Sequence, residues 1–183
     1  MTPSRPAIAV FGSSGPREGE PLYELARQIG ESLGRAGFDV VTGGYGGVME
    51  GASRGAREAG AGAVGVTCEI FSARSPNPYL TQEAPAEDLH LRTRELVRRS
   101  DGFVILDGKA GTLAELSFLW ALMRAGCLAS RPVIVWGEAW ADLIDFLGRL
   151  GTLDEGELLQ TARAASPEDV VRHLRHSFPR GES

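Results

Sequence analysis

The chain has 183 residues, enough for one domain of ordinary size that buries its apolar side chains without disulfides or a structural metal. Hydrophobic residues make up 43% and charged residues 23%, which is a globular composition, and the net charge of -5 argues against a nucleic-acid-binding protein with a broad basic face. A small anionic ligand needs only a local site. The sequence therefore predicts one domain over residues 1–183, with no nucleic acid as partner.

Cysteine usage and hydropathy indicate the compartment. Cys68 and Cys127 belong to no Cys-x-x-Cys or Cys/His cluster, so we expect neither a metal site nor a disulfide. The N-terminal apolar run is too short for a signal peptide, and no later run approaches the roughly 18 apolar residues of a membrane span. We expect a soluble, cytoplasmic protein with no membrane partner.

Five short apolar runs predict buried strands, because they lack the polar alternation of a strand with one wet face. Between them lie segments of helix length, such as the one that carries Leu22, Leu25, Ile29 and Leu33 at spacings of three and four. This alternation predicts right-handed βαβ crossovers and an α/β fold: a single-domain, Rossmann-like, doubly wound parallel sheet with helices on both faces. The predicted strands are 7–11, 39–42, 63–67, 102–106 and 132–136.

Two later segments interrupt this pattern. Residues 71–85 are rich in proline and predict a long loop near the ligand, with a disordered excursion as the alternative. Residues 158–161 predict a weaker strand, and Ser166 followed by Pro167 predicts the start of a last helix. The tail over 177–183 is expected to fray.

Glycine-rich turns follow the first two predicted strands. Ligands of open parallel sheets bind outside the carboxyl ends of the strands, so these turns are candidate anion sites, although a tight turn that merely needs glycine is the alternative for the first. The second turn leads into a helix whose N-terminal dipole could face an anion, but its spacing does not match the dinucleotide fingerprint. The candidates are Gly12 and Ser13 in the first turn and Gly44, Gly46, Gly47 and Met49 in the second.

A third turn follows the strand at 102–106 and contributes Gly108, Lys109, Gly111 and Thr112, with Glu115 three residues on. Thr112 and Glu115 have the spacing of a capping box, so a purely structural role is the alternative for both. Such a cap would also place a carboxylate beside exposed amides that could hold phosphate. Upstream, residues 87–100 predict a helix with Leu89, Leu96 and Val97 inward and arginines on its other sides.

Taken together, the segments GGYGGVMEGASRGA, LHLRTRELVRRSDGFVIL and DGKAGTLAE resemble the LOG family, formerly labelled lysine decarboxylases, within the DprA-like group of Rossmann folds. The likeness runs in order over residues 7–136. Residues 47–52 match the family's glycine-rich turn, Arg92 its arginine-bearing helix, and Gly108, Gly111, Thr112 and Glu115 its signature P-G-G-x-G-T-x-x-E. The sequence departs from the family at Asp107, Lys109 and Thr93, where the family has proline, glycine and lysine.

The resemblance implies hydrolysis of the N-glycosidic bond of a nucleoside 5'-monophosphate, of the AMP or cytokinin riboside monophosphate type, to base and ribose 5-phosphate. Glu115 would stabilise the positive charge that builds on the ribose and orient the attacking water, while Arg92 would hold the substrate and the carboxylate. Backbone amides of the glycine-rich turns would bind the phosphate. A homodimer with the site near its interface is also implied, with Phe118 and Trp120 either in that contact or in the core.

Three other readings of the same residues differ in chemistry. A non-catalytic carrier of a nucleotide-like or molybdenum-cofactor-like phosphorylated ligand is the alternative that the three departures favour, and fold relatives include such a carrier. An NAD-dependent oxidoreductase would need the missing fingerprint. A pyridoxal phosphate enzyme would have to use Lys109, the only lysine, at a position where the family has glycine, so we expect no cofactor and no metal.

Overall fold

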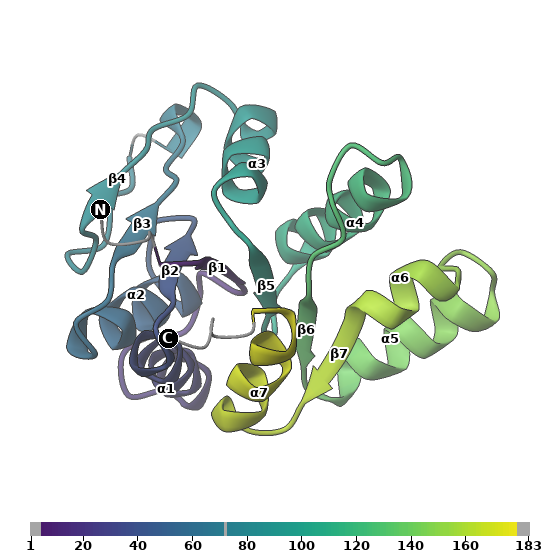
Figure 1. Ribbon diagram of the computed structural model, residues 1–183. Coiled ribbons are helices and arrows are strands. Elements are labelled where there is room, and N and C mark those ends of the chain that lie inside the picture. The colour runs from purple at the N-terminus through teal and green to yellow at the C-terminus, as the bar shows by residue number, and fades with distance from the viewer. Residues whose placement is uncertain (1–4, 72, 179–183) are drawn as a thin grey trace.

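The computed structural model describes residues 5–71 and 73–178. Its centre is a seven-stranded sheet in the order β4-β3-β2-β1-β5-β6-β7, in which every neighbouring pair is parallel (Figure 1). The predicted doubly wound α/β fold is confirmed. The strands are β1 (Ala7–Phe11), β2 (Asp39–Thr42), β3 (Ala63–Gly65), β4 (Gln82–Glu83), β5 (Gly102–Ile105), β6 (Val133–Trp136) and β7 (Thr161–Ala164).

Helices cover both faces of this sheet because successive side chains of a strand point to opposite sides. In β1, Ile8 and Val10 join one apolar cluster, and Ala9 and Phe11 join the other. The first cluster includes side chains of α1 (Pro21–Ala36), α2 (Val48–Glu58) and α7 (Pro167–Ser177). The second includes side chains of α3 (Leu89–Arg98), α4 (Ala110–Arg124) and α5 (Glu138–Arg149), and the short helix α6 (Glu155–Gln160) packs beside α4.

The strand order reverses at β1. The chain moves outward from β1 through β2 and β3 to β4, then returns to the other side of β1 with β5, which pairs Ile8 with Gly102. Such a reversal opens a crevice beyond the carboxyl ends of the two central strands, because the segments that follow them diverge to opposite faces. The first and third glycine-rich turns leave β1 and β5 at this point.

The strand predicted at 158–161 is wrong. Residues up to Gln160 belong to α6, and β7 begins only at Thr161. Asp154 and Glu157 form a reciprocal capping box at the start of α6, which satisfies amides that a strand would have to pair elsewhere. Helix α5 was not predicted; Trp140 and Ile144 bury its inner face.

Residues 73–85 form an ordered loop, and the disordered alternative does not describe them. Gln82 and Glu83 add an edge strand to β3, and Asn77 is buried with its amide group donating to the Tyr45 carbonyl. Residue 72 lies outside the described residues. At the other end, Ser177 closes α7 and Phe178 packs edge-on against Phe38, whereas 179–183 of the expected frayed tail lie outside them. None of the helices in the described ranges is long and apolar enough to cross a bilayer.

Candidate active site

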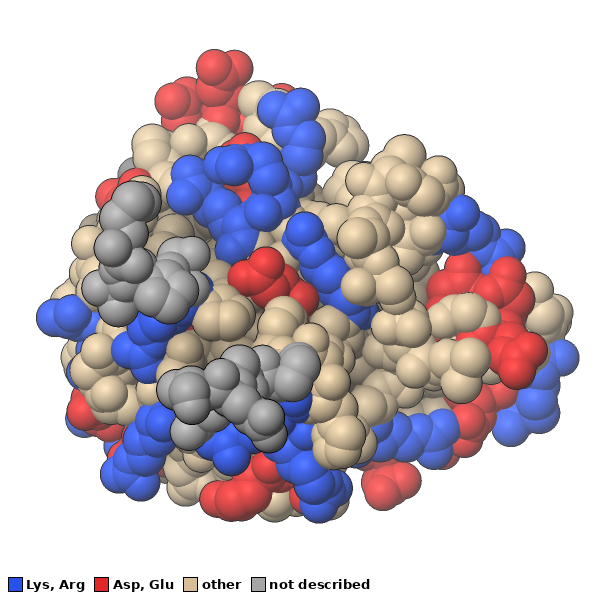
Figure 2. Space-filling view, in the orientation of Figure 1, with Lys and Arg blue, Asp and Glu red and all other residues tan. Residues whose placement is uncertain are grey.

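A pocket of about 250 Å³ lies at the carboxyl ends of β1, β2 and β5. Figure 2 shows the opposite face of the molecule, toward the amino ends of the strands, where basic side chains flank acidic ones between α3 and α4; the pocket lies on the far side of that view. Eight of the residues predicted from the sequence line the pocket, and they come from all three glycine-rich turns and from α3. They are Gly12, Ser13, Met49, Arg92, Lys109, Gly111, Thr112 and Glu115.

Four predicted glycines do not line this pocket: Gly44, Gly46, Gly47 and Gly108. Two of them have a packing role instead. Gly47 has φ +73, and a Cβ there would collide with the carbonyl oxygen of Ser13. A Cβ at Gly108 would collide with the side chain of Thr112. Gly47 thus lets the turns after β1 and β2 approach closely, and Gly108 leaves room for the Thr112 side chain, which lines the pocket.

Helix α4 begins earlier than the sequence suggested. Lys109 is its N-cap residue and the first intrahelical bond runs from the Leu113 amide to the Lys109 carbonyl, at 3.1 Å. Thr112 therefore lies inside the first turn, and the capping box between Thr112 and Glu115, which was the structural alternative, does not form. The first three amides of a helix have no partner within it, so residues 110–112 present donors and the positive end of the helix dipole next to Lys109.

Glu115 and Arg92 face each other across the floor of the pocket. Their closest atoms, Glu115 Oε1 and Arg92 Nη1, are 3.7 Å apart, and their side chains are 15% and 11% exposed. Arg92 is held from behind, because Nε donates to the Val66 carbonyl at 2.9 Å and Nη2 to the Gly43 carbonyl at 3.2 Å. A guanidinium fixed in this way has a defined direction, and its remaining nitrogen points at the carboxyl group.

Burial raises the pKa of Glu115 from 4.5 to about 7, and the positive charge of Arg92 opposes this shift only in part. A carboxyl group in a pocket of low dielectric loses hydration in its charged form, which explains the direction. Near neutral pH the group therefore exchanges a proton readily, a property of general acids and bases.

The sequence did not identify an aromatic wall at the outer side of the pocket. Tyr45, Phe71 and Arg74 all line it. The Tyr45 hydroxyl donates to the carbonyl of Cys68 and accepts from its amide, and the Phe71 ring stands edge-on to Tyr45 at 5.9 Å. The Arg74 guanidinium lies 5.1 Å from the centre of the Phe71 ring. The only signal for this wall was the prediction that residues 71–85 lie near the ligand.

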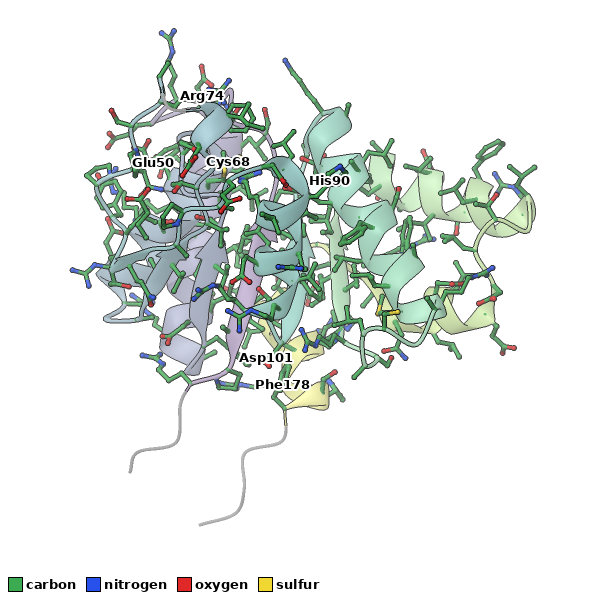
Figure 3. All side chains as sticks on the ribbon, turned by 90° about the horizontal axis from the view of Figure 1, so that it is seen from above. Glu50, Cys68, Arg74, His90, Asp101 and Phe178 are labelled. Carbon is green, nitrogen blue, oxygen red and sulfur yellow. The ribbon has the colours of Figure 1, made fainter. Side chains whose placement is uncertain are left out.

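Arg74 and Cys68 lie together at one end of the sheet, and Asp101, which precedes β5, lies at the opposite end (Figure 3). The wall therefore belongs to the carboxyl edge, where the glycine-rich turns are.

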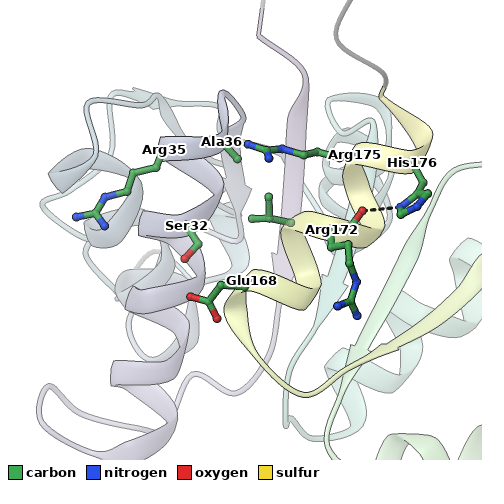
Figure 4. A pocket seen from close by; sticks show the side chains of 8 residues that line it. Ser32, Arg35, Ala36, Glu168, Arg172, Arg175 and His176 are labelled. Atoms are coloured by element: carbon green, nitrogen blue, oxygen red, sulfur yellow. Dashed lines mark hydrogen bonds between the residues drawn. The ribbon is translucent and has the colours of Figure 1, made fainter.

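A larger groove of about 560 Å³ separates α1 from α7 (Figure 4). Its charged side chains are exposed, and two of its arginines have partners outside it: Arg35 pairs with Glu31 and Arg172 with Asp169. No ionisable side chain that lines it is buried. The smaller pocket, which holds Glu115, is thus the better candidate for chemistry.

Comparisons with known proteins identify a family and several relatives of this chain. The SLOG cluster4 family matches residues 5–158. The chain is 28% identical over 184 residues to a Mycobacterium tuberculosis protein named cytokinin riboside 5'-monophosphate phosphoribohydrolase. The matched region covers 94% of this chain and 93% of that protein. It is 30% identical to the Escherichia coli K12 pyrimidine/purine nucleotide 5'-monophosphate nucleosidase, over 63% of this chain and 27% of that protein.

Among solved structures, the molybdenum cofactor binding protein from Rippkaea orientalis superposes with a TM-score of 0.74 at 24% identity, and the match covers 95% of this chain and 98% of that one. At this level of identity the likeness shows the shared fold.

Proposed function

The chain belongs to the SLOG cluster4 family, and on that basis we propose that it hydrolyses the N-glycosidic bond of a nucleoside 5'-monophosphate, giving the free base and ribose 5-phosphate. The observation that carries the proposal is the buried Glu115, whose pKa is raised to about 7, facing a fixed Arg92 in the pocket. The names of the relatives from Mycobacterium tuberculosis and Escherichia coli support this class of reaction.

The proposed chemistry uses Glu115 in its ionised form. As the bond from ribose C1' to the base breaks, positive charge develops on the sugar ring, and a nearby carboxylate stabilises it. A water molecule beside the carboxylate adds its oxygen to C1', and its proton passes to Glu115. The bonding electrons leave with the base, which takes a proton from solvent.

Arg92 is proposed to position this carboxylate. Its two bonds to backbone carbonyls at the ends of β2 and β3 leave Nη1 directed at Glu115. At 3.7 Å the two groups form an ion pair without a tight hydrogen bond, so a ribose hydroxyl or a water could bridge them.

The phosphate is proposed to bind at the start of α4. Amides of residues 110–112 and the positive end of the helix dipole favour an anion there, and Lys109 adds a full positive charge at the pocket wall. The Gly12–Ser13 turn, which follows the neighbouring strand β1, also lines the pocket. This placement puts the phosphate at the β1 and β5 end of the crevice.

We also propose a single-domain, cytoplasmic homodimer. Leu113 and Phe118 on the outer face of α4 are 40% and 37% exposed, whereas Trp120 is buried in the core. An apolar face next to the pocket suits a second copy of the chain. The solution mass should be that of a dimer and should fall to that of a monomer in Phe118→Glu; a wild-type monomer would contradict this.

A non-catalytic carrier is the second candidate, favoured by Lys109 at the pocket wall. The other two departures from the family, Thr93 and Asp107, do not line the pocket. The Thr93 hydroxyl donates instead to the Leu89 carbonyl within α3. A carrier would bind a phosphorylated ligand tightly and release no base.

The test is base release from a panel of nucleoside 5'-monophosphates, with ribose 5-phosphate measured as the second product. We expect release by the wild-type chain, loss of at least 100-fold in Glu115→Gln, and wild-type rates in Glu87→Gln, a matched change at an exposed glutamate. Tight nucleotide binding with no release from any member of the panel would refute hydrolysis and support the carrier.

A further inference from the structure

The pocket has a direction set by the order of the strands. Along the carboxyl edge, Phe71 and Arg74 follow β3, Tyr45 follows β2, the Gly12–Ser13 turn follows β1, and the start of α4 follows β5. Neighbouring strands are about 4.8 Å apart, so β3 and β5 are separated by about 14 Å. A nucleoside monophosphate with its phosphate at α4 and its ribose at Glu115 would therefore place its base against the residues that follow β2 and β3.

Aromatic and cationic groups form this end of the pocket. Tyr45 is 4% exposed and clamped by both of its bonds to the Cys68 backbone, so it gives the Phe71 ring a fixed support. Phe71 is half-buried and Arg74 is exposed, in contrast to Arg92 and Glu115 on the floor. A flat ring that enters from solvent would meet Phe71 and the Arg74 guanidinium first, and the Phe71 ring stacks well on nucleobases.

This end of the pocket offers a bound base mainly hydrogen-bond donors. A guanidinium has five donors and no acceptor. Among the described residues that line the pocket after β2 and β3, the Gly43 carbonyl already accepts from Arg92, and the Tyr45 hydroxyl already accepts from the Cys68 amide. The Met49 sulfur also faces Arg92, at 3.9 Å. The outer edge of a bound base would therefore meet donors.

We propose that Phe71 and Arg74 form the nucleobase subsite and that it selects 6-oxopurines, so that GMP and IMP are better substrates than AMP. Guanine and hypoxanthine present two acceptors, O6 and N7, which match an arginine fork. Adenine presents an amino group at position 6, which would face another donor. This inference rests on the proposed function for its orientation of the nucleotide, and it names the substrate class of that site.

The experiment compares kcat/KM for GMP, IMP and AMP in the wild-type chain and in three variants. We expect the wild type to prefer the 6-oxopurines by roughly 5- to 150-fold, the range for one bidentate contact to a base. Arg74→Ala should lose that factor on GMP and IMP and change AMP less than twofold. Arg74→Gln should shift preference towards AMP, because glutamine offers adenine both an acceptor and a donor. Arg94→Gln, an exposed arginine outside the pocket, is the charge-matched control.

The role of Phe71 is tested by substitutions that remove or keep an aromatic ring. Phe71→Leu should weaken the binding of all three nucleotides about equally, by roughly 5-fold or more, because it removes a stacking interaction that does not depend on which base is bound. Phe71→Trp should retain binding. Unchanged affinity in Phe71→Leu would overturn its place in the subsite.

Binding to the Glu115→Gln variant, measured by calorimetry with GMP and AMP, separates this inference from the proposed reaction. No base release by the wild type would refute hydrolysis, yet a GMP preference that disappears in Glu115→Gln/Arg74→Ala would still support the subsite. A preference for AMP, or an equal loss on all nucleotides in Arg74→Ala, would overturn it.

Discussion

Replacing Glu115 by glutamine removes the proposed catalytic group, but it should stabilise the protein relative to the wild type, by an amount that increases as pH rises. Burial raises the pKa of Glu115 from 4.5 to about 7, so the folded state holds this proton more tightly than the unfolded state does. The free energy of unfolding of the wild type therefore includes a contribution that is present below pH 4.5 and is lost as pH rises through 7. Above pH 7 the folded chain holds a buried carboxylate at a cost that glutamine avoids.

The magnitude follows from the shift. One pKa unit corresponds to about 1.36 kcal/mol, so a shift from 4.5 to about 7 corresponds to about 3 kcal/mol. For a chain of this length that is a change in Tm of roughly 6 to 12 °C. Because the side chain is 15% exposed, solvent screening makes this figure an upper bound.

The assay is urea unfolding of both proteins at intervals from pH 4.5 to pH 9. The variant leaves Arg92 without its carboxylate partner, which shifts its stability by an amount that does not depend on this titration. The informative quantity is thus the change with pH in the difference between the two free energies of unfolding. We expect that difference to move by up to about 3 kcal/mol in favour of Glu115→Gln as pH rises.

Glu87→Gln supplies the control, since Glu87 is exposed and lies outside the pocket. Its difference from wild type should stay flat across the same range. A flat difference for Glu115→Gln as well would refute the reasoning, because it would show that the buried carboxyl group titrates alike in the folded and unfolded chain.

Three further predictions concern the same site and its scaffold. If the ionised carboxylate is the active form, kcat/KM should rise with pH and level off above a midpoint near 7, and a profile flat from pH 5 to 8 would exclude Glu115 as the group that titrates. Arg92→Gln should lower kcat/KM about 100-fold and move that midpoint upward, because the charge of Arg92 lowers the pKa of Glu115; a midpoint that stays in place would contradict this coupling. Gly47→Ala should destabilise the fold by about 1 to 3 kcal/mol in thermal unfolding, and more than Gly151→Ala does, because both glycines have positive φ but only at Gly47 would the added Cβ meet another chain segment, at Ser13.

Much of the architecture could be predicted from local sequence. Continuous apolar runs predicted β1, β2, β3, β5 and β6, because strands that are buried on both faces need no polar alternation. Their alternation with helical periodicity predicted the doubly wound sheet. The two-residue strand β4 and the shift of β7 to Thr161 were missed, since an edge strand this short has no pattern and the capping box of Asp154 and Glu157 was not recognised.

The candidate site, too, could be predicted from the sequence only in part. Glu115 and Arg92 were identified from a motif, but which lining residues touch the substrate stays a prediction. The sequence by itself determined that glycine-rich turns follow apolar strands, because backbone conformation and strand burial depend on local residue types. Only the tertiary structure decided that Glu115 is desolvated and that Tyr45, Phe71 and Arg74 form one wall. Desolvation and stacking depend on atoms that lie far apart in the chain and meet only when the strands pair and the helices pack on them.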